Sequence, residues 1–121
     1  MTKTSKPVAW VGSSYDDLCA FPDPVQDAMG FALYLAQTGG KHANAKPLKG
    51  FGGAGVLEIV DDHDGDTYRA VYTVKFADAV YVLHAFQKKS KTGVKTPPAD
   101  IEKMKRRLKA AEEDYKTRGG A

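Results

Sequence analysis

Three consecutive stretches in the middle of the chain have the pattern of β-strands, and short turns join them. Residues 67–76, TYRAVYTVKF, alternate with a period of two, so Tyr68, Ala70, Tyr72, Val74 and Phe76 share one side of a strand. The stretch VLEIV (56–60) precedes it and is joined to it by the turn DDHDGD. The stretch AVYVLHAF (79–86) follows it after the short connection Ala77-Asp78. Because strands joined by short turns pair antiparallel, the sequence predicts an antiparallel meander.

Helical patterns lie on both sides of this meander in the sequence. A short strand at residues 6–10 precedes a helix from Ser13 or Ser14 to Phe21 and a longer one from Asp23 to the Gly39-Gly40 pair. After a loop at 41–55 and the meander, a last helix begins near Thr96. The order β-α-α-β-β-β-α predicts one α+β domain over residues 1–121, a small antiparallel sheet with helices packed on one face. We expect the tail, residues 117–121, to be disordered.

Composition and charge restrict the classes of protein that fit. No stretch approaches the roughly 20 apolar residues of a membrane span, and the N-terminus has no apolar signal-peptide core. The single cysteine, Cys19, cannot form an internal disulfide. These features predict a cytoplasmic protein without a membrane segment. The positive charge is uneven, since residues 84–121 carry 11 basic and 5 acidic side chains, a net charge of +6.

Lysines follow the last strand of the meander directly. Lys88, Lys89 and Lys91 follow Phe86 after a single glutamine, and Arg69 lies in the neighbouring predicted strand. Cations from adjacent strands can meet in one groove, where arginine holds a phosphate bidentately and lysine acts as a point charge. Aromatic rings nearby can stack on bases, although each ring alone fits a core position equally well. A polyanion site and a solvated basic surface both remain open.

Two other motifs carry weaker signals. The acidic stretch DDHDGD has the alternate aspartates of a calcium loop, but Thr67 occupies the position of the required glycine, and Asp64-Gly65 is a good hairpin turn. The glycine-rich GFGGAG lacks the Lys-Ser/Thr end of a phosphate-binding loop. His84, inside a predicted strand, fits a hydrogen-bonded strand residue better than a catalytic base.

Several of these segments together resemble a known family. The segments KPLKG, GVLEI and DGDTYRAVYTVKFADAVYVLHAFQKKSKTG, followed by DIEKMKRRL, resemble the RelE/ParE toxin superfamily, and within it the HigB-like, phage-derived branch. The resemblance extends from about Val8 to Tyr115. It implies the toxin of a type II toxin–antitoxin system, an endoribonuclease that cleaves mRNA, usually at the ribosome. It further implies a cognate antitoxin, often a helix-turn-helix protein, and a reaction that needs no metal or cofactor.

The resemblance also implies roles for individual residues. Arg69 matches the strand arginine that holds the scissile phosphate. Lys88 and Lys89 match basic residues at the end of the last strand, and Lys46 and Lys49 match loop lysines that bind RNA. The implied reaction is attack of a ribose 2′-OH on the adjacent phosphate. The general acid and base stay open between Tyr72, His84 and a lysine; further RNA contacts are expected from Phe86, Lys91 and Lys95.

The match departs from the family pattern at two places, which keeps other functions open. After LEI the family frequently places a basic residue, whereas this chain has Val60 followed by the acidic stretch DDHDGD. RelE-like members often carry an arginine and a tyrosine after the last strand, and KKSKTGVKTPPAD contains neither. A ParE-like inhibitor of DNA gyrase and a phage-derived binding protein without catalytic activity are therefore the alternatives to a ribonuclease.

Overall fold

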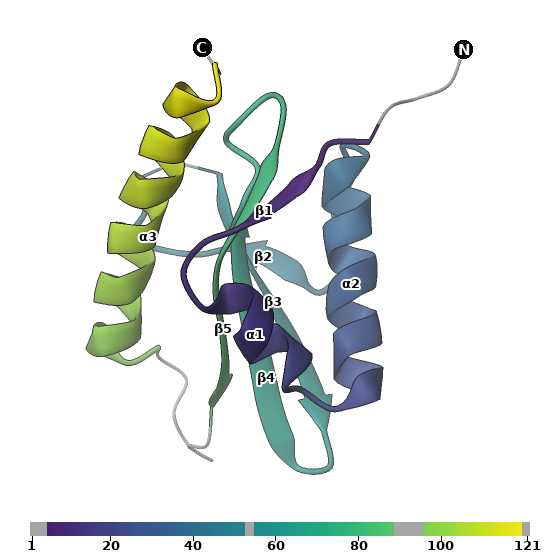
Figure 1. Cartoon of the computed structure of the whole chain (residues 1–121). Helices are drawn as coiled ribbons and strands as arrows, with labels where there is room; N and C mark the ends of the chain where they lie inside the picture. Colours follow the sequence, from purple (N-terminus) through teal and green to yellow (C-terminus); the bar gives the residue numbers. More distant parts are fainter. Residues whose placement is uncertain (1–4, 53–54, 89–95, 120–121) are drawn as a thin grey trace.

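The computed structural model describes residues 5–52, 55–88 and 96–119, and within them it contains a five-stranded sheet and three helices. The helices are α1 (Ser14–Cys19), α2 (Asp23–Gln37) and α3 (Pro98–Thr117). The strands are β1 (Val8–Trp10), β2 (Ala45–Pro47), β3 (Val56–His63), β4 (Asp66–Thr73) and β5 (Val80–Lys88). Their order across the sheet is β1-β5-β4-β3-β2 (Figure 1). The α+β class predicted from the sequence is confirmed.

The predicted meander forms the centre of the sheet. β3 pairs antiparallel with β4, and β4 pairs antiparallel with β5. The turn between β3 and β4 consists of Asp64 and Gly65, whose φ angles are 51° and 82°. Positive φ at both central residues is typical of a type I′ hairpin, and the pair His63↔Asp66 closes it. The hairpin prediction for DDHDGD is therefore confirmed.

The two edges of the sheet differ from the sequence prediction. β1 pairs parallel with β5, so the sheet is mixed rather than wholly antiparallel. The segment 41–55, predicted as a loop, contributes the short strand β2, which pairs antiparallel with β3. A strand of only three residues beside a glycine-rich stretch has no recognisable alternation, so the sequence pattern did not predict it. At the other end of the chain, α3 continues to Thr117 and the Arg118 backbone N–H donates to Asp114, so the predicted disorder does not include these residues.

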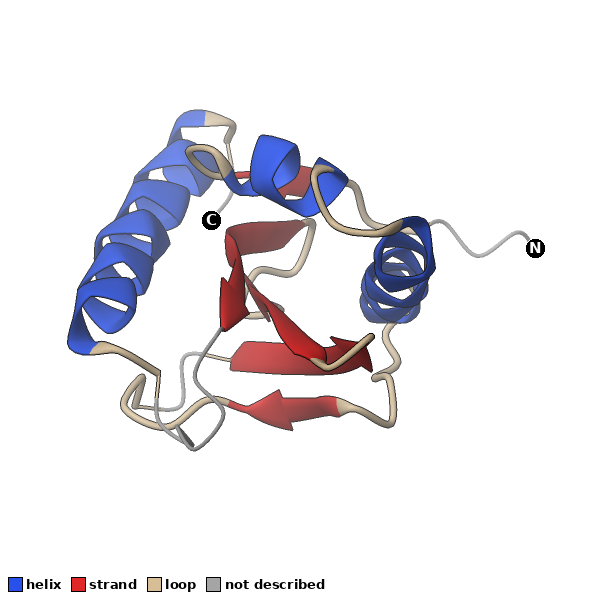
Figure 2. Cartoon of the chain, turned by 90° about the horizontal axis from the view of Figure 1, so that it is seen from below, coloured by secondary structure: helices blue, strands red, loops and turns tan. Residues whose placement is uncertain are grey.

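The helices cover both faces of the sheet, whereas the sequence interpretation placed them on one (Figure 2). One face packs under α1 and α2, where Val25 and Met29 meet Tyr72, Val82 and other strand residues. The opposite face packs under α3, where Met104 and Ala111 meet Val71, Tyr81 and Leu83. Because successive strand residues point to opposite faces, the two apolar sets of β4 and β5 require helices on both sides. Among the described residues, no helix is long and apolar enough to cross a membrane.

Candidate functional site

Arg69 of β4 forms an ion pair with Glu58 of β3. In the ladder Arg69 lies opposite Val60, and Glu58 lies opposite Val71, so the two residues are diagonal neighbours. Arg69 Nη1 donates to Glu58 Oε1 at 2.8 Å, and the two side chains are only 14% and 13% exposed. Arg69 Nε and Glu58 Oε2 are buried without a hydrogen-bond partner in the part of the chain that the structure describes. Arg69 Nε–H is therefore a donor without an acceptor, and Glu58 Oε2 is an acceptor without a donor.

This pair lies on the side of the sheet that α3 covers. Val71, two residues after Arg69 in β4, belongs to the apolar cluster under α3. Side chains two residues apart in a strand share a side, so Arg69 faces the same way. A register shift between β4 and β5 at Val71/Tyr72 adds a residue to β5, and both Leu83 and His84 contact the α3 side. The bulge thus brings His84 to the same side as Arg69.

His84 connects β5 to the first turn of α3. Its Nε2 lies 2.8 Å from Asp100 Oδ1, and its ring stacks on Phe86, with centroids 4.6 Å apart and planes at 18°. Phe86 is itself the ladder partner of Arg69. Burial lowers the pKa of His84 from its ordinary value of 6.5, and Arg107 and Lys103 lower it further, against the opposing effect of Asp100. The neutral ring therefore carries its hydrogen on Nε2 and donates to the carboxylate.

The lowered pKa of His84 predicts a dependence of stability on pH. The unfolded chain, in which His84 regains a pKa near 6.5, binds more protons than the folded protein as pH falls through that value. Titration of His84 should therefore leave the free energy of unfolding unchanged above pH 6.5 and decrease it as pH falls below that value. Urea titrations from pH 7.5 to 5.5 should show this slope in the wild type and a smaller slope in His84→Gln. An unchanged slope in His84→Gln would contradict the assignment.

Tyr72, predicted as a possible general acid or base, lies on the other side of the sheet from Arg69. It is fully buried and packs in the cluster under α1 and α2. Burial raises the pKa of its hydroxyl to about 12. Tyr72 is therefore a core residue, and the structure does not bring it together with Arg69.

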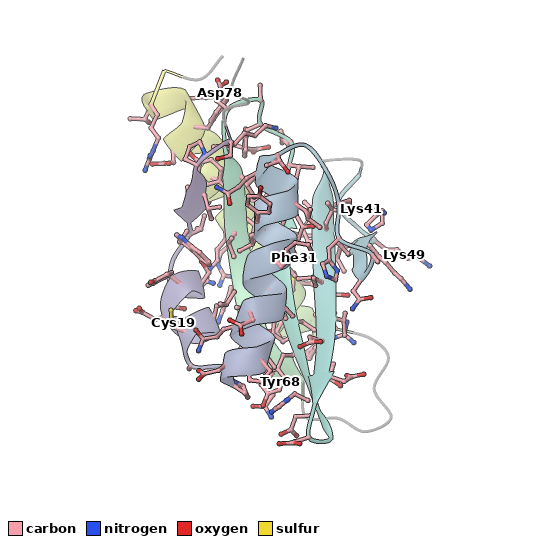
Figure 3. The ribbon with its side chains drawn as sticks, turned by 90° about the vertical axis from the view of Figure 1, so that its right-hand side faces the viewer. Cys19, Phe31, Lys41, Lys49, Tyr68 and Asp78 are labelled. Carbon is pink, nitrogen blue, oxygen red and sulfur yellow. The ribbon has the colours of Figure 1, made fainter. Side chains whose placement is uncertain are left out.

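The predicted basic residues are spread over two parts of the structure. Lys46 of β2 is exposed and is the ladder partner of Glu58, which places it on the same side of the sheet as the ion pair. Lys49 follows β2 and is also exposed (Figure 3). The backbone of Lys88 lies at the end of β5, opposite Thr67 and two residues after Phe86. Lys89, Lys91 and Lys95 lie outside the described residues. The prediction that Arg69 and Lys88 belong to neighbouring strands is confirmed.

Glu58 is a site residue that the sequence interpretation did not select. A signal for it existed, because a single carboxylate inside the apolar stretch VLEIV is costly to bury unless it has a partner. The same cost applies to Arg69 in the next strand. Pairing the two predicted strands through the Asp64-Gly65 turn would have placed the acid and the arginine two ladder positions apart.

Comparison with known proteins gives one finding. The family model described as "Phage derived protein Gp49-like (DUF891)" matches residues 16–109, a range that begins in α1 and ends within α3. Glu58, Arg69, His84 and Asp100 all lie inside the matched range. A search of curated proteins found no match.

Proposed function

Because the chain belongs to the Gp49-like family of phage-derived proteins, which is part of the RelE/HigB-type toxin group, we propose that it is a toxin that cleaves RNA. The family is associated with the toxins of toxin–antitoxin systems. The observation that supports cleavage is the Glu58–Arg69 pair, in which a carboxylate and a guanidinium meet with one unpartnered polar atom each. A carboxylate can act as general base and a guanidinium can bind the phosphate oxygens, which is one combination that serves attack of a ribose hydroxyl on a phosphate.

The proposed reaction is a transfer within the RNA strand. Glu58 accepts the proton of the ribose 2′-OH, whose oxygen then bonds to phosphorus while the bond from phosphorus to the 5′-oxygen breaks. Arg69 binds the non-bridging oxygens and stabilises the negative charge that develops on them. A proton reaches the departing 5′-oxygen from Lys88 or from solvent, with Lys89 supporting the charge. The products are a 2′,3′-cyclic phosphate and a free 5′-hydroxyl, and the reaction needs no metal.

Other residues support this site indirectly. Phe86 lies beside Arg69 in the ladder and is held by the ring of His84, which Asp100 fixes in turn. We infer that His84 positions Phe86 as a surface on which a base can stack, since the imidazole itself is only 4% exposed. Lys46 and Lys49 extend positive charge along the edge of the sheet at β2, where the RNA backbone would pass.

The proposal includes the partners that the family suggests. Messenger RNA, engaged at the ribosome in the cytoplasm, is the proposed substrate, and a helix-turn-helix antitoxin the proposed inhibitor. One observation favours a second candidate function, a binding protein without catalytic activity: the positive charge of Arg69 is already neutralised by Glu58. In the first function an RNA phosphate must compete with this carboxylate, and in the second the pair is purely structural.

Expression of the chain alone in bacteria tests the proposal. Growth should stop, and the ends of cellular transcripts should map to new cuts within coding regions. Lys88→Ala should restore growth, whereas Lys116→Ala, at the far end of α3, should leave the protein toxic. Growth arrest with intact transcripts and altered DNA supercoiling would instead identify a gyrase inhibitor. Normal growth with an abundant, folded protein would favour the binding protein.

A further inference from the structure

A groove of about 680 Å³ lies between β1 and the C-terminal half of α3. At one end of it, Arg107 donates to Leu83 O at 2.9 Å and to Ser13 Oγ at 3.2 Å, which ties the middle of α3 to the segment after β1. The groove lies at the opposite end of α3 from Asp100 and His84, so it is separate from the candidate cleavage site. Its lining includes Val8 and Trp10 of β1, Asp78 before β5, and Asp114, Tyr115 and Arg118 at the end of α3.

One wall of this groove is an open edge of the sheet. β1 pairs with β5 on one side only and is the terminal strand (Figure 1). Pro7 O accepts from the Val80 N–H, and the Val11 N–H donates to Val82 O, both at 3.0 Å. In a parallel ladder alternate residues bond to the neighbour, so the N–H and C=O groups of Val8 and Trp10 point away from β5. Within residues 5–52, 55–88 and 96–119, no hydrogen bond to these four groups is present.

The opposite edge of the sheet, at β2, has no free N–H group that could pair with a further strand, unlike the edge at β1. In β2 the N–H of Leu48 donates to Val56 O, so the outward-facing positions of this strand are Ala45 and Pro47. Pro47 has no N–H, and the Ala45 N–H donates to His42 O at 3.0 Å. No outward donor of β2 is therefore free for another strand. Proteins commonly block edge strands in this way, and β1 has no such block.

The charges in the groove specify the chemistry of an occupant. Asp114 accepts from the Tyr81 hydroxyl at 2.7 Å and pairs with Arg118 at 2.8 Å, so its charge is balanced. Asp78, which also lines the groove and lies at the top of the molecule in Figure 3, accepts from the Tyr115 hydroxyl at 3.0 Å, and among the described residues no cation pairs with it. A lysine or arginine in the occupant would supply the missing positive charge.

We propose that this groove binds an extended segment of a partner protein, which adds to the sheet as a strand beside β1 and places a basic side chain at Asp78. The main chain of the segment pairs with Val8 and Trp10, and its side chains alternate between the groove and the opposite side. A second copy of this chain fits less well, because β1 itself, Val8–Trp10, carries no charge to offer Asp78.

Nuclear magnetic resonance titration of the full-length, ¹⁵N-labelled protein tests this inference. The probe is the peptide acetyl-Lys-Val-Thr-Val-Ala-amide, together with two versions, one N-methylated at its second and fourth residues and one at its third. The amide signals of Val8 and Trp10 should shift with the unmodified peptide. One methylated version should bind at least roughly tenfold more weakly and the other should bind normally, since only alternate amides of a strand face its neighbour.

Variants of the protein provide the second part of the test. Val8→Pro removes an outward N–H that the β1–β5 ladder does not use, and should weaken peptide binding roughly tenfold without changing the rest of the spectrum. Asp78→Asn should weaken the lysine peptide severalfold and leave a version with alanine in place of lysine unchanged. The proposal is overturned if the Val8 and Trp10 signals do not respond to the peptide, or if binding is insensitive to Val8→Pro. Shifts that follow protein concentration rather than peptide would also overturn it, and would assign the edge to a second copy. None of these outcomes depends on RNA cleavage.

Discussion

Replacement of Arg69 by alanine is expected to reduce RNA cleavage by about 10²- to 10³-fold, the loss seen when one donor to a developing oxyanion is removed. The reason is that the Arg69 guanidinium, paired with Glu58 on the α3 side of the sheet, is the group proposed to bind the non-bridging phosphate oxygens. Initial rates with a ribosome-bound mRNA measure the effect. Arg118→Ala, which removes an exposed arginine with its own aspartate partner, should cleave at the wild-type rate.

Arg69→Ala is expected to destabilise the fold as well as to slow cleavage, and a second variant distinguishes these two effects. In Arg69→Ala the Glu58 carboxylate, 13% exposed, loses its partner, and breaking a buried pair in this way costs about 3–5 kcal/mol. The double variant Glu58→Gln/Arg69→Gln replaces the pair by two amides that can hydrogen-bond to each other. We expect it to be folded, by circular dichroism and urea denaturation, and inactive. Wild-type cleavage by the folded double variant would remove both residues from the mechanism.

Met29→Ala and Met104→Ala should each lower the free energy of unfolding by about 2–5 kcal/mol, the usual cost of a cavity at a fully buried methionine. Both residues are 0% exposed, and they project from α2 (Met29) and from α3 (Met104) into the two apolar clusters. Urea denaturation measures both. Tyr34→Ala, at a position 55% exposed on α2, should change stability by less than about 0.5 kcal/mol. If Met104→Ala were as mild as Tyr34→Ala, α3 would not form the second core, and the helices would cover one face as the sequence had suggested.

The strands and helices could be predicted where a residue pattern is long or a turn is specific. Residues 67–73 alternate cleanly, and Asp64-Gly65 determines the hairpin, so β3, β4 and β5 follow from local rules. The placement of α3 does not follow locally. The alternation ends at Thr73, after which Phe76 joins Tyr81 and Tyr115 under α3 instead of sharing the side of Tyr72. Which helix covers which face depends on these contacts between distant residues.

The candidate site could be predicted only in part, for a similar reason. The sequence selected Arg69 as a cation that could meet the lysines of the next strand around an RNA phosphate, so the expected anion beside it was the phosphate. The partner in the structure is Glu58, two ladder positions away, and the register that joins them depends on the hairpin turn. Likewise His84 reaches the α3 side because of a bulge beside Tyr72, and no sequence pattern signals that bulge.

The chemical ends of cleaved RNA test the central claim most directly. Purified protein should convert a defined ribosome-bound mRNA into fragments that end in a 2′,3′-cyclic phosphate and begin with a 5′-hydroxyl, because the proposed attacking oxygen is that of the neighbouring ribose hydroxyl. Glu58→Gln/Arg69→Gln should produce none. Intact RNA after incubation with the wild-type protein, or fragments that begin with a 5′-phosphate, would contradict the account.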